Sequence, residues 1–243
     1  MAEERYRRRA TLMARLYFFA EGPTELTFAN TVLKPHLANF GVYMQGAILI
    51  AHARKKRRVH RGGGRNFTAM QSDIHRFLKH DSGNDVFFTT MIDLYALHRN
   101  FPGLEEAEKL RNTPYKRVEA LERSWLDETR DDRFIPFIQL HEFEAYLFSD
   151  VSQFAFFFDN ADSKISALQR VVDGVQSPEL INDGQHTAPS KRINGQFSEY
   201  ERSKTRVGPQ MAERIGLENL RSKCSHFRAW IERLESLGAG PVS

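Results

Sequence analysis

Three acidic side chains stand where predicted strands and helices meet, and their chemistry favours metal binding. Glu21 and Glu25 flank a short turn, and Asp93 directly follows the apolar run from Phe87 to Ile92. Neighbouring carboxylates repel one another unless a cation or a proton separates them. Their oxygens are hard ligands that suit Mg²⁺ or Mn²⁺ better than a dedicated zinc site. We therefore predict that Glu21, Glu25 and Asp93 hold Mg²⁺ or Mn²⁺.

Two of these acids also have a purely structural alternative. Glu25 falls in the first turn of a predicted helix, where a carboxylate complements the positive end of the helix dipole. Asp93, as a loop residue, can simply accept hydrogen bonds from nearby backbone N–H groups. Metal binding is favoured for Asp93 because Glu21, which also follows a predicted strand, should lie near it.

A second group of polar residues follows the apolar run from Phe134 to Leu140. Glu142 and Glu144 are candidates to complete the metal site. His141 can bind the metal or act as a general base, and its alternative is a structural histidine held by hydrogen bonds. The zinc-protease motif is excluded, because it requires a second histidine four positions later and position 145 is alanine.

The sequence also contains a dense basic segment. Its arginines and lysines are Arg54, Lys55, Lys56, Arg57, Arg58, Arg61 and Arg65. The whole chain carries a net charge of +4. Such a block attracts nucleic-acid phosphates through its summed field and the release of counterions, without reading the base sequence. Its alternative is a solvated surface loop.

The elements that position these residues follow from alternating apolar runs and helical patterns. Strands are predicted at 12–20, 42–51, 86–92 and 134–140, and helices begin near 23, 67, 105 and 115. This alternation predicts a mainly parallel four-stranded sheet with helices on both faces. The carboxyl ends of parallel strands share one edge, where ligands of such sheets bind. Glu21, Asp93, His141 and Glu142 all follow strand ends, so we expect the sheet to gather them.

The pattern changes after residue 150. Residues 151–243 show helical or irregular patterns without a convincing strand, and apolar residues recur at helical spacing between 218 and 237. We therefore expect an α/β core over residues 1–150. A helical C-terminal region over residues 151–243 should pack on that core.

The composition limits the class of protein. The chain has 243 residues, of which 41% are hydrophobic and 27% charged, as in ordinary globular domains. Its longest apolar runs are too short to span a bilayer, and its N-terminus lacks the apolar segment of a secretory signal. The single cysteine, Cys224, excludes an internal disulfide and a multi-cysteine zinc site. We expect a cytoplasmic protein with no membrane partner.

The chain resembles the domain of unknown function 4276 family over nearly its full length. The stretches that carry the resemblance are Glu21-Gly-Pro-Thr-Glu25, Phe101-Pro-Gly, His141-Glu-Phe-Glu-Ala-Tyr-Leu-Phe, Pro178-Glu-Leu-Ile-Asn-Asp, Thr187-Ala-Pro-Ser-Lys-Arg-Ile and Cys224-Ser-His-Phe. That family is assigned to Toprim-like folds. The resemblance therefore implies a Toprim-like Rossmannoid core, related to the Toprim domains of the OLD (overcoming lysogenisation defect) nucleases.

One departure from the Toprim pattern affects the expected metal site. Toprim domains usually carry Asp-x-Asp after the third strand, whereas this chain has Asp93-Leu94-Tyr95. Tyrosine cannot replace a carboxylate as an anionic ligand at neutral pH. The site therefore either binds one metal or recruits Glu142 or Glu144 in place of the second aspartate.

The same resemblance implies roles for two cations. OLD-type nucleases place a lysine near the metals, which implies that Lys191 stabilises the negative charge that builds on the reacting phosphate. Arg192 would then hold a neighbouring phosphate through two parallel hydrogen bonds. The alternative is that both are solvated surface cations.

Together these features predict a metal-dependent nuclease that hydrolyses phosphodiester bonds of DNA or RNA. The resemblance implies an effector of prokaryotic antiviral defence. The alternative is a catalytically inactive Toprim-like subunit that binds nucleic acid or regulates a partner. Similar families act beside AAA or ABC-type ATPases, and this chain has no Walker A motif, so an ATPase would act in trans. The sequence is also compatible with a homo-oligomer.

Overall fold

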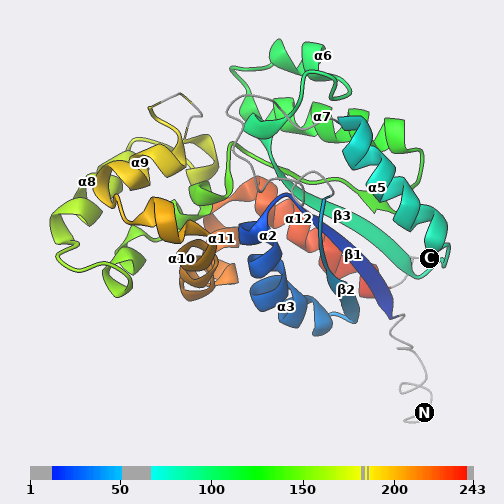
Figure 1. The fold of residues 1–243 in the computed structure, drawn as a ribbon, viewed down its shortest axis with the longest axis horizontal. Helices are drawn as coiled ribbons and strands as arrows, with labels where there is room; N and C mark the ends of the chain where they lie inside the picture. The colour runs from blue at the N-terminus through cyan, green and yellow to red at the C-terminus, as the bar shows by residue number, and fades with distance from the viewer. Residues whose placement is uncertain (1–12, 51–66, 182–183, 185, 240–243) are drawn as a thin grey trace, which may run out of the picture.

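A computed structural model describes residues 13–50, 67–181, 184 and 186–239 of the chain (Figure 1). At its centre lies a sheet of strands β1 (Ala14–Ala20), β2 (Val42–Leu49), β3 (Val86–Asp93), β4 (Phe134–Ile135) and β5 (Ile138–Gln139). The strand order is β2-β1-β3-β4, and β5 also pairs with β3. Every pairing is parallel. The predicted mainly parallel α/β sheet is confirmed.

The fourth predicted strand differs from the expectation, because residues 134–140 form two short strands instead of one. Pro136 lies between β4 and β5 and has no N–H to donate to the ladder. Side chains of β3 bridge the gap. Thr89 Oγ1 donates to the Ile135 carbonyl at 2.7 Å, and the Phe137 N–H donates to Thr90 Oγ1 at 2.9 Å. The sheet therefore has five strands rather than four.

Helical segments connect and cover these strands. Those before β4 are α2 (Pro23–Phe28), a π-helical turn η1 (Ala29–Leu33), α3 (Lys34–Ala38), α5 (Phe67–His80), η2 (Leu94–Ala96), α6 (Leu104–Glu108) and α7 (Pro114–Thr129). Those after β5 are η3 (Phe143–Ser149), η4 (Val151–Phe156), α8 (Asp162–Asp173), η5 (Pro178–Leu180), α9 (Pro189–Gln196), α10 (Tyr200–Ile215), α11 (Leu217–Lys223), α12 (Ser225–Ser236) and η6 (Leu237–Ala239). Among the described helices, none has the length and apolar character needed to cross a membrane.

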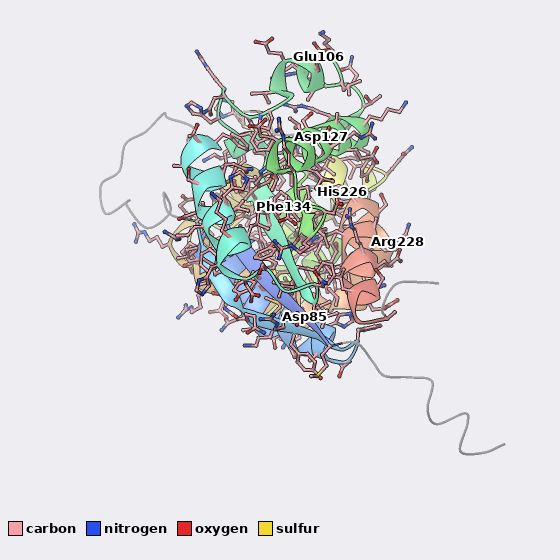
Figure 2. All side chains as sticks on the ribbon, turned by 90° about the vertical axis from the view of Figure 1, so that its right-hand side faces the viewer. Asp85, Glu106, Asp127, Phe134, His226 and Arg228 are labelled. Atoms are coloured by element: carbon pink, nitrogen blue, oxygen red, sulfur yellow. The ribbon has the colours of Figure 1, made fainter. Side chains whose placement is uncertain are left out.

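The side chains of β1 alternate between two hydrophobic clusters, as the two-residue period of a strand requires. Leu16 and Phe18 belong to the cluster that contains α2 and α12. Tyr17 and Phe19 face the cluster that contains α5 and α7. Figure 2 shows α5 on one side of the strands and α12 on the other, with Phe134 between them. Helices therefore cover both faces of the sheet, as predicted.

The C-terminal region returns to the sheet through α12. Trp230 stacks on Phe137 with ring centroids 4.1 Å apart, and its indole N–H donates to Thr89 Oγ1 at 2.9 Å. His226, labelled near the start of α12 in Figure 2, hydrogen-bonds Glu122 of α7 at 3.0 Å. Truncating a buried tryptophan such as Trp230 typically costs about 3–5 kcal/mol. The predicted helical C-terminal region is confirmed, whereas a domain boundary at residue 150 stays a prediction.

Candidate functional site

Glu21 and Asp93 lie at the carboxyl ends of neighbouring strands. β1 and β3 are paired in parallel with Ala20 opposite Met91, which brings the residues that follow them together. Glu21 is buried, and its Oε2 accepts a hydrogen bond from the Asp93 N–H at 2.6 Å. The predicted placement of these two acids at one edge of the sheet is therefore correct, while their role in binding metal stays a prediction.

Glu25 is buried at the start of α2. Its Oε2 accepts a hydrogen bond from the Gly22 N–H at 2.9 Å, so the carboxylate does cap the helix. A Cβ at position 22 would lie 3.1 Å from that same oxygen, so a larger residue there would require the Glu25 carboxylate to shift slightly. Burial raises the pKa of Glu25 above its ordinary value, although the backbone hydrogen bonds partly oppose this.

Asp93 contacts an amide that sequence reasoning did not single out. Gln139, fully buried at the end of β5, donates its side-chain N–H to Asp93 Oδ1. Burial raises the pKa of Asp93 well above its ordinary value, and the charges of Glu25, Glu144 and Glu142 raise it further. Asp93 and these three glutamates therefore repel one another when they are ionised.

Glu142 and Glu144 are both buried, and each is held by a residue of the C-terminal region. Glu142 accepts the Ser190 N–H at Oε1 and the Ser190 hydroxyl at Oε2, the latter at 3.1 Å. The Tyr200 hydroxyl donates to Glu144 Oε1 at 3.3 Å. Burial, followed by the charge of Glu142, raises the pKa of Glu144 from 4.5 to about 7. Both acids thus join the carboxylate cluster of Glu21, Glu25 and Asp93.

Lys204 of α10 interacts with this cluster and is not among the residues predicted from the sequence. Burial lowers its pKa, but the charges of Glu144, Glu201, Glu142 and Asp93 outweigh burial and raise it overall. The spacing of residues in α10 could have pointed to Lys204. Tyr200, Lys204 and Gly208 recur every four residues, and a Cβ at position 208 would lie 3.1 Å from the Tyr200 hydroxyl. That spacing places all three on one face of a helix.

A cavity of about 300 Å³ opens beside the cluster. Its lining comprises Tyr95, His141, Glu142, Gly184, Ala188, Ser190, Lys191, Glu201 and Lys204. Strand ends and the C-terminal helices α9 and α10 therefore meet at one concave surface. His141 and Lys191, which the sequence analysis proposed for catalysis, both face it together with Glu142.

Other predicted residues are not brought to this cavity by the described structure. Arg192 donates its Nε to the Thr187 carbonyl at 2.7 Å, within its own loop and helix. Its predicted contact with phosphate stays a prediction. The basic residues Lys55, Lys56, Arg57, Arg58, Arg61 and Arg65 lie outside the described residues.

The cluster fits a hard divalent cation by the chemistry of its donors. All five acids offer carboxylate oxygens, which Mg²⁺ and Mn²⁺ prefer. Glu21 and Asp93 also line a second cavity of about 20 Å³, room for about one water-sized particle. Within residues 13–50, 67–181, 184 and 186–239, however, no three His, Cys, Asp or Glu side chains form a ready-made metal site. Binding would require contacts such as the Gln139 hydrogen bond to Asp93 to rearrange.

The chain matches a known protein family over most of its length. The family model described as a domain of unknown function, DUF4276, matches residues 20–235. No curated protein and no solved structure matches the chain. The matched span contains every acid of the cluster, the cavity-lining cations Lys191 and Lys204, and all but the last residue of α12.

Proposed function

The chain belongs to the DUF4276 family, and we propose that it is a metal-dependent nuclease that hydrolyses phosphodiester bonds of DNA or RNA. The observation that carries the proposal is the cluster of Glu25, Asp93, Glu142 and Glu144, in which burial, followed by repulsion between the acids, raises the pKa of Asp93 and Glu144. Buried acids that destabilise one another are typical of sites that bind a cation or act on a proton. We also propose that the core is related to Toprim domains.

Glu21 and Asp93 would hold the metal, together with Glu25, Glu142 or Glu144. Lys204 alone cannot offset several ionised carboxylates, so a divalent cation would relieve the remaining repulsion. When bound, Mg²⁺ or Mn²⁺ supplies positive charge to the phosphate and lowers the pKa of an attacking water. The carboxylates thereby fix where the scissile phosphate lies.

Two residues of the 300 Å³ cavity then act on the substrate. The Lys191 ammonium binds a non-bridging oxygen of the phosphate, where negative charge increases as the reaction proceeds. The His141 imidazole accepts the proton of the attacking water as a general base. Both lie at the same concave surface as Glu142, which agrees with a shared substrate position.

A catalytically inactive subunit that binds nucleic acid or regulates an ATPase partner is the second candidate. Two observations favour it. Tyr95 stands where Toprim domains carry their second aspartate, and the described acids do not form a ready-made metal site. Either function fits the proposed setting in antiviral defence. The single cysteine, Cys224, favours a cytoplasmic location.

The test compares cleavage by the wild type and by Glu21→Gln. Glutamine keeps an oxygen to accept the Asp93 N–H but loses the charge that holds a cation. We expect Mn²⁺-dependent cleavage of single- and double-stranded DNA and RNA by the wild type and a loss of about 100-fold or more in Glu21→Gln. Glu119→Gln, at an exposed position of α7, is the control and should cleave normally. Equal cleavage by Glu21→Gln and wild type would refute the proposed site.

A further inference from the structure

The cavity beside the carboxylates contains an exposed aromatic ring that the proposed chemistry does not use. Tyr95 lies two residues after Asp93, in the 3-10 turn η2, and is 61% exposed. It lines the cavity together with Lys191 and Lys204. An aromatic side chain at this exposure beside two lysines is a surface that suits a planar, anionic ligand.

The backbone fixes where this ring stands. η2 begins directly at the end of β3, and the Tyr95 N–H donates to the His141 carbonyl at 3.4 Å. The segments that carry Asp93 and His141 are therefore joined at Tyr95. Tyr95 therefore stands on the short segment that directly follows Asp93 and beside the one that carries Glu142.

The cavity has the size and lining of a site for a single nucleotide. Its volume of about 300 Å³ lies at the lower end of ligand pockets, about 300–1,000 Å³. Lys191 and Lys204 suit the phosphate, while Glu201 can accept hydrogen bonds from amino groups of a base. This mixture of cations and acids suits a nucleotide better than a bare phosphate. A base stacked inside a duplex cannot reach such a cavity without leaving the stack.

We propose that Tyr95 stacks on the base of an unpaired nucleotide in this cavity, so that the protein acts on single-stranded or locally unpaired nucleic acid. The inference rests on the proposed nuclease function, because it places that nucleotide next to the phosphate held at Glu21 and Asp93. Stacking on an aromatic ring accommodates every base. Selectivity for unpaired strands therefore comes without a preference for sequence.

The test is equilibrium binding of labelled DNA in Ca²⁺, measured by fluorescence anisotropy. The probes are a single strand, its perfect duplex, and the same duplex with one unpaired nucleotide. The wild type should bind the first and third more tightly than the second. Tyr95→Ala should weaken binding to the single strand by about 5- to 150-fold, the effect of losing one base-aromatic stack, and leave the perfect duplex unaffected. Tyr95→Phe keeps the ring and should stay within about threefold of wild type.

Tyr43→Ala is the matched control, because Tyr43 is 44% exposed on β2 and does not line the cavity. It should bind all three probes like the wild type. The stacking role would be overturned if Tyr43→Ala and Tyr95→Ala lost the same affinity for the single strand. It would also be overturned if Tyr95→Ala lost as much affinity for the perfect duplex as for the single strand. Mn²⁺-dependent cleavage is measured in parallel. Its absence in the wild type refutes the nuclease proposal, whereas normal cleavage with unchanged binding by Tyr95→Ala refutes stacking alone.

Discussion

Replacing Glu144 by Gln should stabilise the metal-free protein at alkaline pH and leave its stability at acidic pH unchanged. Burial and the charge of Glu142 raise the pKa of Glu144 from 4.5 to about 7 in the folded protein. Below pH 4.5 the carboxyl is protonated in both folded and unfolded chains, so its contribution to stability is fully present. As the pH rises towards 7, the unfolded chain releases this proton first, and the folded state progressively loses stability.

The magnitude follows from that interval. From pH 4.5 to about 7, at about 1.4 kcal/mol per pH unit, the loss amounts to roughly 3.5 kcal/mol. Gln cannot ionise, but its amide oxygen can still accept the Tyr200 hydroxyl, now 3.3 Å from Glu144 Oε1. The free energy of unfolding of Glu144→Gln should therefore exceed that of wild type by about 2–4 kcal/mol near pH 8.5 and match it near pH 4.

The assay is urea denaturation from about pH 4 to 8.5 in the presence of EDTA, followed by tryptophan fluorescence. Glu119→Gln, at its exposed position on α7, should differ from wild type by less than about 0.5 kcal/mol throughout. The contrary result is that the free energies of unfolding of Glu144→Gln and wild type differ by the same amount at every pH, or by less as the pH rises. Either result would show that burial and the charge of Glu142 do not raise the pKa of Glu144.

Two further predictions concern the cations. Lys191→Ala should lower the single-turnover cleavage rate by about 100-fold or more while leaving binding in Ca²⁺ nearly unchanged, since a fixed cation stabilises the transition state more than the ground state. A rate within about threefold of wild type, less than ~1 kcal/mol of barrier, would exclude that role. Replacing Lys55, Lys56, Arg57 and Arg58 with Ala should lower the slope of log affinity against log salt concentration by about 3–4 on duplex DNA. An unchanged slope would show that these four residues do not contact phosphate.

The alternation of apolar runs and helical patterns was sufficient to predict the parallel sheet and the edge where Glu21 and Asp93 meet. That prediction works because a strand end is a local feature, and parallel pairing brings such ends together whatever the intervening sequence. The fourth strand was predicted less well. The apolar run from Phe134 to Leu140 contains Pro136, which interrupts the ladder even though the run reads as a single strand.

The C-terminal side of the site could not be assigned from the sequence alone. Lys204 and Tyr200 reach the carboxylates because α10 packs against α2, a contact between elements about 180 residues apart that no local pattern specifies. Gln139 was missed for a different reason. It lies inside an apolar strand, and only the structure shows that its amide binds Asp93. For Tyr200 and Lys204, the sequence did contain one clue, which is their spacing of four residues in a region predicted to be helical.

The most direct test of the central claim is an anomalous difference map from crystals soaked in Mn²⁺ near pH 8. We predict a peak about 2.0–2.3 Å from carboxylate oxygens of Glu21 and Asp93. A third oxygen should come from Glu25, Glu142 or Glu144, and the Gln139 contact to Asp93 should be broken. The peak should be absent from Glu21→Gln crystals treated identically. No peak at this edge of the sheet in the wild type, at a Mn²⁺ concentration that supports cleavage, would contradict the account.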